Sequence, residues 1–165
     1  MTILLIRHSL AVEREEWRGN DLQRPLTRRG VKRAYRFFDV LSKIYPKIDY
    51  IIVSKAQRTK QTGEILKKFY PDCVFEQTGL LYPGAVKADF EEALKDKNGI
   101  VAVVGHEPDL SNYLKDIMHS PNLNVKFSKP SVAVLEEGVL KGLFQYKQFK
   151  AIYEKSKKIK KTELK

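Results

Sequence analysis

Short apolar runs of strand length alternate along this chain with longer segments that have the periodicity of helices. The clearest runs lie at residues 3–6, 50–53 and 100–104, with a shorter one at residues 73–75. Continuous apolar runs are typical of strands buried on both faces, as in parallel sheets that helices cover on both sides. Strands and helices in alternation form right-handed crossover units. The sequence therefore predicts an α/β fold, a three-layer α/β/α sandwich with a mainly parallel central sheet.

Segments between these runs repeat apolar residues every three or four positions, which marks the buried face of a helix. In the first such segment the residues are Val31, Ala34, Tyr35, Phe38 and Leu41. Thr27 is expected to cap this helix and Pro46 to end it. A second helix is expected directly after residues 50–53. A third is expected to end at Asn98-Gly99, and a fourth to begin with Pro108 as its first helical residue.

The last part of the chain is expected to add an antiparallel edge to the sheet. Residues 131–135 and 140–149 flank Glu136-Glu137-Gly138, a pattern that favours a hairpin. We expect one domain over residues 1–150, followed by a lysine-rich C-terminal tail over residues 151–165.

Charge is unevenly distributed in this basic chain. The formal net charge is +11, and seven of the 31 lysines and arginines fall within residues 150–165. Such a run is typical of a solvated helix face or a frayed end, and contact with a phosphate-rich partner or an acidic protein surface is the alternative. No nucleic-acid-binding motif and no basic strand interleaved with aromatic residues is present, so we expect no nucleic-acid partner.

The usual sequence marks of export and membrane insertion are missing. The N-terminus enters a strand at once, and no apolar run approaches the roughly 20 residues that span a bilayer. The single cysteine, Cys73, cannot form an internal disulfide. We therefore expect a cytoplasmic monomer that does not bind a membrane.

Two of the three histidines follow strands in equivalent positions. His8 comes directly after the first strand, and His106 follows residues 100–104 with Gly105 between them. Open α/β sheets bind ligands at the carboxyl ends of their strands, so we expect the two imidazoles to share one site. A single histidine in such a place is more often a structural group, but the pair indicates chemistry. His119 is expected at the surface.

Three arginines occupy the same kind of position. Arg7 adjoins His8, Arg24 lies in the first strand-to-helix connection, and Arg58 follows the second strand. A guanidinium group matches the oxygens of phosphate with two parallel hydrogen bonds. The helix that starts near Arg58 also turns its N-terminal amides toward this edge. Any one of these arginines could be an ordinary surface group, but the three together indicate a phosphate site.

Four blocks of sequence follow one another in a recognisable order. They are Leu5-Ile6-Arg7-His8, Arg24-Pro25-Leu26-Thr27-Arg28-Arg29-Gly30, Ser54-Lys55-Ala56-Gln57-Arg58-Thr59-Lys60-Gln61-Thr62 and Val104-Gly105-His106-Glu107-Pro108. Together they strongly resemble the histidine phosphatase superfamily, the phosphoglycerate-mutase-like group, and within it the short SixA-type phosphohistidine phosphatases. The resemblance covers residues 2–145. It implies the phosphoglycerate mutase-like fold and a phosphatase that uses no metal and no cofactor.

The resemblance also implies roles for individual residues. His8 matches the family's nucleophile, which carries a transient phosphoryl group. The groups that hold the phosphoryl oxygens and stabilise the transition state match Arg7, Arg58 and His106. Arg24 matches an arginine of the SixA-type pattern and is expected to reach the phosphate. Ser9 replaces the glycine that usually follows the nucleophile, and it is small enough for substrate to approach closely.

The region after the third strand bears on the substrate. Phosphomonoesterases of this superfamily protonate the leaving alkoxide with a carboxylic acid from that region, but residues 76–84 hold no glutamate after Leu80-Leu81. SixA-type members likewise lack this acid, and their phosphohistidine substrate explains why, because the P–N bond is labile. We therefore expect a phosphohistidine-containing protein as the substrate, rather than a small phosphorylated molecule.

Glu107 leaves alternatives open. We expect it beside the substrate, where it orients His106, donates a proton or caps the helix at Pro108. With Glu107 as the acid, a general phosphomonoesterase for small phosphate esters is the rival activity. A catalytically silent phosphate-binding module is the other alternative.

Overall fold

The computed structural model describes residues 1–163 and contains a six-stranded sheet in the order β3-β2-β4-β1-β5-β6. The strands are β1 (Thr2–Arg7), β2 (Tyr50–Ser54), β3 (Val74–Thr78), β4 (Ile100–Gly105), β5 (Ser131–Glu136) and β6 (Val139–Gln145). The first four run parallel, and β5 and β6 add an antiparallel edge beside β1. The predicted sandwich with a mainly parallel sheet is confirmed.

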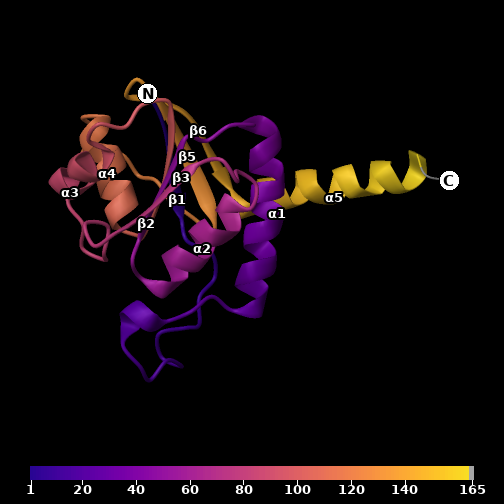
Figure 1. Ribbon diagram of the computed structural model, residues 1–165, viewed down its shortest axis with the longest axis horizontal. Helices are drawn as coiled ribbons and strands as arrows, with labels where there is room; N and C mark the ends of the chain where they lie inside the picture. Colours follow the sequence, from indigo (N-terminus) through magenta and orange to yellow (C-terminus); the bar gives the residue numbers. More distant parts are fainter. Residues whose placement is uncertain (164–165) are drawn as a thin grey trace.

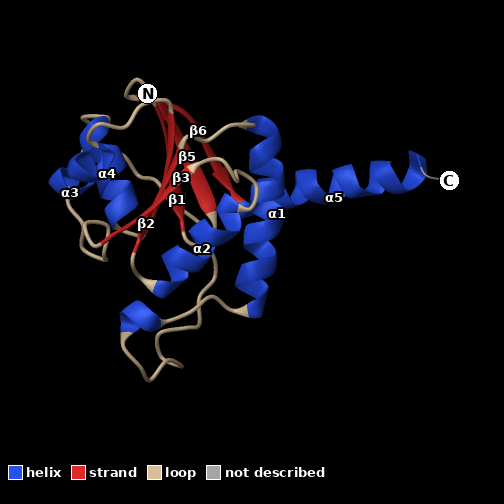
Figure 2. Cartoon of the chain, viewed as in Figure 1, coloured by secondary structure: helices blue, strands red, loops and turns tan. Residues whose placement is uncertain are grey.

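Helices cover both faces of the sheet (Figures 1 and 2). They are α1 (Arg28–Ile44), α2 (Gln57–Lys67), α3 (Lys87–Leu94), α4 (Asp109–Ile117) and α5 (Tyr146–Glu163), with a short 3-10 helix, η1, at Asp21–Gln23. One face carries α1 and α2 together with the start of α5, and the other carries α3 and α4. The rest of α5 projects from the body of the molecule (Figure 1). Within residues 1–163, no helix has both the length and the apolar character needed to cross a membrane.

Alternation along the strands divides the core into two layers. In β1, Leu4 and Ile6 pack on the α1 side, whereas Ile3 and Leu5 pack on the side of α3 and α4. Both faces of the sheet are therefore buried away from water, which explains why the parallel strands have unbroken apolar runs in the sequence. Each fully buried side chain of this size contributes roughly 1.5–3 kcal/mol to folding.

The start of α1 is held against the loop that follows β1. Thr27 caps the helix as predicted, because its side chain accepts a hydrogen bond from the Gly30 amide at 2.9 Å. A Cβ atom at Gly30 would lie only 1.9 Å from the carbonyl oxygen of Leu10. A glycine is therefore required for the helix to approach this loop so closely.

The predicted C-terminal end of the hairpin, Phe149, is wrong. Residues 140–149 were expected to form one strand, but β6 ends at Gln145 and α5 begins at Tyr146. The helix starts where the Gln148 side chain accepts a hydrogen bond from the Gln145 amide at 2.7 Å. Phe149 then turns inward and stacks on Phe37 with 4.6 Å between ring centroids. The aromatic residues after Gln145 are spaced as in a helix, although the sequence prediction assigned them to a strand.

Smaller boundaries also differ. Pro108 is the N-cap of α4 and not its first helical residue, and α3 ends at Leu94, before Asn98-Gly99. The hairpin turn lies where predicted, with positive φ angles at Glu137 and Gly138. The tail expected over residues 151–165 continues α5 through Glu163, and its last two residues lie outside the described part of the chain.

Candidate active site

His8 and His106 lie side by side at the carboxyl edge of the sheet. In the parallel pair of β1 and β4, Arg7 is opposite Gly105, so the residues that follow them are neighbours. The His8 amide donates to the Gly105 carbonyl at 3.2 Å, and the two imidazole centroids are 5.4 Å apart. The two residues are only 5% and 3% exposed. The structure thus brings together the two histidines that were expected to share a site.

A backbone hydrogen bond sets the tautomer of His8. Its Nδ1 lies 2.7 Å from the carbonyl oxygen of Ser9. A carbonyl only accepts, so Nδ1 must carry the proton, and Nε2 of the neutral ring keeps a free lone pair. That nitrogen is the chemically available nucleophile of the side chain.

Both histidines are held neutral. Burial first, and then the adjacent His106, lowers the pKa of His8 well below its ordinary value. Burial and the positive charge of Arg58 lower the pKa of His106 to about 3. Desolvation and neighbouring cations both disfavour imidazolium. A neutral ring is the form in which His8 can attack an electrophile.

Arg7 and Arg58 are fixed by contacts with the loops around the two histidines. Arg7 donates from Nη1 to the carbonyl oxygen of Phe127. Arg58, in the first turn of α2, donates from Nη1 to the Asp21 carbonyl at 2.9 Å and pairs through Nη2 with the Asp21 carboxylate at 3.2 Å. Burial lowers the pKa of both arginines, opposed by Glu107 at Arg7 and by Asp21 at Arg58.

Asp21 is a functional candidate that the sequence interpretation missed. Besides Arg58, its carboxylate binds Arg24 Nε at 3.1 Å and Arg14 Nη1 at 3.2 Å. Burial alone would raise the pKa of Asp21, but the hydrogen bond from Arg24 and the three arginine charges together lower it. In the sequence, the only indication of this role was an acidic residue three positions before Arg24. Asp21 joins two phosphate-binding candidates, Arg24 and Arg58, that lie far apart in the sequence.

Three buried nitrogen atoms at this site have no hydrogen-bond partner. Among the described residues, the buried side-chain atoms of this kind are Arg7 Nε, Arg58 Nε and His106 Nδ1. Buried polar nitrogens are nearly always satisfied, and the two arginine Nε atoms are donors, so the group suits a site whose ligand supplies acceptors. A phosphoryl group offers three such oxygens. We call Arg7, His8, Arg58 and His106 the histidine–arginine cluster.

Hydroxyl groups form hydrogen bonds with the residues of the cluster and with the loop that follows His8. Ser54 Oγ, at the end of β2, lies 3.1 Å from His106 Nε2, which leaves Nδ1 as the open nitrogen of that ring. Thr62 of α2 accepts from the Ser9 amide at 3.1 Å. Ser9 donates its own hydroxyl proton to the Gly30 carbonyl at 2.7 Å and is fully buried. Its hydroxyl proton is therefore committed to the scaffold, and its predicted substrate contact stays a prediction.

Glu107 lies beside the cluster and caps α4. Its two carboxylate oxygens accept from the Ser111 amide at 3.1 Å and from the Ser111 hydroxyl at 3.0 Å. Burial raises its pKa, although Ser111 and Arg7 act in the opposite direction. The geometry favours the capping interpretation and leaves a half-buried carboxyl group that accepts a proton more readily than usual.

Lys129 is a second residue that the sequence interpretation missed. It lies in the loop before β5, where the segment has no periodicity that would have marked it. Burial lowers the pKa of its half-buried ammonium group, and the charge of Arg7 lowers it further. The histidine–arginine cluster is thus bordered by another cation.

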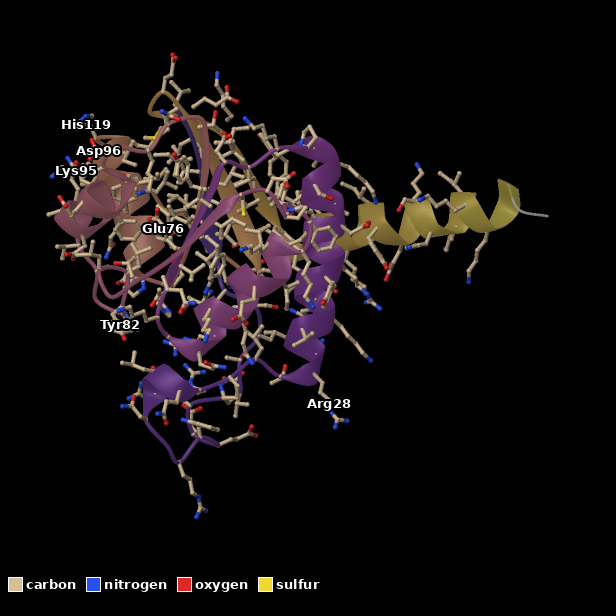
Figure 3. The ribbon with its side chains drawn as sticks, viewed as in Figure 1. Arg28, Glu76, Tyr82, Lys95, Asp96 and His119 are labelled. Atoms are coloured by element: carbon tan, nitrogen blue, oxygen red, sulfur yellow. The ribbon has the colours of Figure 1, made fainter. Side chains whose placement is uncertain are left out.

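The prediction that His119 lies at the surface is confirmed (Figure 3). His119 is exposed beyond the C-terminal end of α4, whereas His106 precedes the N-terminal end of the same helix. Glu76 belongs to β3 and pairs with Lys97 at 3.1 Å. In the loop after β3, the Gly84 amide donates to Asp109 at 2.9 Å, so this buried carboxylate anchors the loop.

The chain matches known proteins in sequence and in fold. The family model of the histidine phosphatase superfamily (branch 1) matches residues 3–80. No curated protein sequence matches significantly. Among solved structures, the protein histidine phosphatase SixA complexed with tungstate superposes with a TM-score of 0.77 at 19% identity, covering 90% of this chain and 99% of that one.

Other similar structures have different activities in their names. Phosphoglycerate mutase from Plasmodium falciparum superposes with a TM-score of 0.63 at 21% identity, covering 86% of this chain and 88% of that one. The alpha-ribazole phosphatase from Shigella flexneri reaches 0.67 at 14% identity, covering 88% and 97%. At these identities the likeness establishes the phosphoglycerate mutase-like fold.

The sequence match includes three of the four blocks recognised in the chain. Residues 3–80 contain Arg7, His8, Arg24 and Arg58, and the fold adds His106 beside them. The chain therefore resembles the histidine phosphatase superfamily in sequence over residues 3–80, and its whole fold is the phosphoglycerate mutase-like fold.

Proposed function

We propose that the protein is a phosphatase that hydrolyses phosphohistidine carried by another protein, through a phosphoryl group held transiently on His8. The observation that carries the proposal is the free Nε2 lone pair of a buried, neutral His8. It is surrounded by cationic donors whose Nε atoms lack partners among the described residues. A nucleophile and a set of anion-binding donors in one dry site suit phosphoryl transfer.

In the proposed reaction, His8 Nε2 attacks phosphorus in line and the P–N bond of the substrate breaks. The electron pair of that bond stays on the substrate imidazole, which takes up a proton and leaves. Arg7, Arg58 and His106 hold the phosphoryl oxygens while charge spreads over them. A water molecule then attacks the phosphorus of phosphorylated His8, loses a proton and releases inorganic phosphate, which restores neutral His8.

The loop after β3 supports a substrate with a good leaving group. Residues 79–86 contain no acidic residue, and the nearby Asp109 carboxylate is committed to the Gly84 amide. An alkoxide would need a proton donor there, whereas protonated imidazole leaves easily. The fold similarity to SixA is consistent with this choice.

The test compares a phosphohistidine peptide with p-nitrophenyl phosphate, using wild-type protein and His8→Ala. We expect turnover of the peptide, acid-labile phosphate on the wild-type protein, and loss of both in His8→Ala. Comparable kcat/KM for the two substrates would contradict the substrate assignment. Full activity of His8→Ala, or labile phosphate on another residue, would contradict the mechanism.

A raised pKa favours one second candidate, a general phosphomonoesterase with Glu107 as the acid. Glu107→Gln keeps the size of the side chain and its acceptor for the Ser111 amide, but it removes the ionisable proton. Loss of ester hydrolysis together with retained phosphohistidine turnover would assign the proton donation to Glu107. Equal effects on both substrates would limit Glu107 to its capping contact.

A further inference from the structure

A groove between α1 and α5 is lined by cations. Its lining residues are Arg29, Lys32, Arg33 and Arg36 of α1, with Tyr146 and Lys150 of α5, around a volume of about 150 Å³. Among the described residues, no carboxylate pairs with any of the four α1 cations, and Lys150 pairs with Glu154 at 3.5 Å. We call this feature the α1–α5 groove.

The side chains that line the groove are held in place by contacts with aromatic rings. The Arg33 guanidinium lies over the Tyr146 ring at 4.5 Å, and Arg36 faces the Tyr153 ring at 5.9 Å. Below them, Phe37 stacks on Phe149 in the core. Stacking on an aromatic ring holds a guanidinium in place and leaves its donors free at the edge. The four α1 cations are thus kept together with no carboxylate paired to them among the described residues, which suits an anionic partner.

The groove lies near the histidine–arginine cluster and is connected to it through Lys129. Arg33 donates from Nη1 to the Lys129 carbonyl at 3.3 Å, and Lys129 borders the cluster. In the sheet, Arg7 is opposite Ser131, and Ser131 is opposite Gln145, the residue before α5. Two strand spacings of about 4.8 Å separate Arg7 from the start of α5, which is roughly 10 Å. One partner can therefore reach both features.

The lining favours a protein as this partner over a nucleic acid. Nucleic acids in single strands bind by stacking their bases on exposed aromatic rings, but Tyr146 is buried beneath Arg33. Guanidinium groups bind carboxylates with two parallel hydrogen bonds, and a groove of about 150 Å³ is the size of a side chain.

We propose that the α1–α5 groove docks an acidic segment of the phosphorylated protein substrate, so that Asp and Glu residues beside the phosphohistidine increase turnover. This inference rests on the proposed function for its substrate. The surface itself is independent of His8, because none of its six lining residues belongs to the histidine–arginine cluster.

The test uses two synthetic phosphohistidine peptides, one with Glu residues flanking the histidine and one with Gln in their place. The groove variant is Lys32→Glu/Lys150→Glu. The matched control, Lys95→Glu/Lys141→Glu, makes the same change in net charge elsewhere: Lys95 lies on the opposite side of the molecule from α5 (Figure 3), and Lys141 lies beside Met1 and Thr2. Circular dichroism checks that each variant is folded.

In the wild type we expect kcat/KM to be about 10-fold higher for the Glu peptide at low salt, as two or three exposed ion pairs would give. The preference should shrink at high salt because exposed pairs are screened. The groove variant should lose the preference while turning over the Gln peptide normally, and the control should keep it. Equal kcat/KM for the two peptides in the wild type, or an unchanged preference in the groove variant, would overturn the proposal.

Binding measured without turnover separates the two proposals. The fluorescent, unphosphorylated Glu peptide is titrated with His8→Ala protein, with and without the groove substitutions. If no phosphohistidine peptide is hydrolysed but the groove substitutions abolish binding, the docking surface stands and the phosphatase assignment fails. Tighter binding of a single-stranded oligonucleotide than of the Glu peptide, lost in the groove variant, would overturn the choice of a protein partner.

Discussion

At the residue scale, Asp21 is unusual because its single carboxylate forms ion pairs with three arginines, Arg14, Arg24 and Arg58. We expect Asp21→Asn to leave Arg58 without its counter-charge and to let the guanidinium move. Misplacement by about 1 Å can cost up to about 100-fold in rate. The measurement is kcat/KM on a phosphohistidine peptide together with the inhibition constant of inorganic phosphate, which should rise because Arg58 binds phosphate less well.

The matched control for this prediction is Asp39→Asn. Asp39 pairs with Lys43 on the surface of α1 at 2.5 Å, so the substitution removes an acid of the same type away from the cluster. It should change neither constant. An unchanged inhibition constant for phosphate in Asp21→Asn would show that Asp21 does not position Arg58.

The two buried histidines also make stability depend on pH. Their pKa values are lowered in the folded protein, so below pH 6.5 the unfolded chain binds protons that the folded chain does not. The free energy of unfolding should therefore fall as the pH drops, by about 1 kcal/mol for each histidine between pH 7 and 5.5. The raised carboxyl pKa values of Glu107 and Asp109 act in the opposite direction, mainly at lower pH.

Urea unfolding at a series of pH values measures this dependence. Replacing both His8 and His106 by Asn should flatten the curve between pH 7 and 5.5, whereas His119→Asn should not, because His119 is exposed. A slope that survives the double substitution would assign the pH dependence to other groups.

At the scale of elements, the contact between α1 and the loop after β1 sets the position of His8. Gly30→Ala should place a methyl group against the Leu10 carbonyl oxygen. Backbone has to shift, at a cost of about 1–3 kcal/mol in stability, and kcat/KM should fall because the loop carries His8. Gly79→Ala is the control, since its Cβ would meet only the Tyr82 ring at 3.5 Å. Wild-type stability and activity in Gly30→Ala would contradict this view of the contact.

Elements with strong periodicity were predictable from the sequence, and contacts between distant loops were not. Residues 100–104 form a strand and Thr27 caps a helix as expected, because these features depend on neighbours in sequence. The strand ends at Gln145 because Phe149 of α5 packs against Phe37. Phe37 and Phe149 are far apart in the sequence, and only the fold brings them together. Asp21 was missed for the same reason: its partner Arg58 is 37 residues away.

The candidate site was predictable to the extent that strand ends identify it. His8, His106, Arg7 and Arg58 each follow or end a strand, and the strand register brings them together. Lys129 lies in a connection without regular structure, and no sequence pattern predicts where such a segment will lie.

At the scale of the whole molecule, helices cover both faces of the sheet, and the large exposed apolar residues of the described chain are spread over several helices, strands and loops. Ile152 and Ile159 are the large exposed apolar residues of α5 among the described residues. Two such side chains among lysines are too little apolar surface for a stable dimer. We expect a monomer of 19.1 kDa by light scattering. Twice that mass, reduced by Ile152→Lys/Ile159→Lys, would show instead that α5 pairs two copies.

The hydrogen bond from His8 Nδ1 to the Ser9 carbonyl has a stereochemical consequence for any phosphoenzyme. With Nδ1 occupied, a phosphoryl group can attach only to Nε2, so the intermediate would be the tele isomer of phosphohistidine and never the pros isomer. The two isomers differ in their lability to acid and in the antibodies that recognise them. An isomer-specific antibody on the trapped protein would therefore report the orientation of a single imidazole ring.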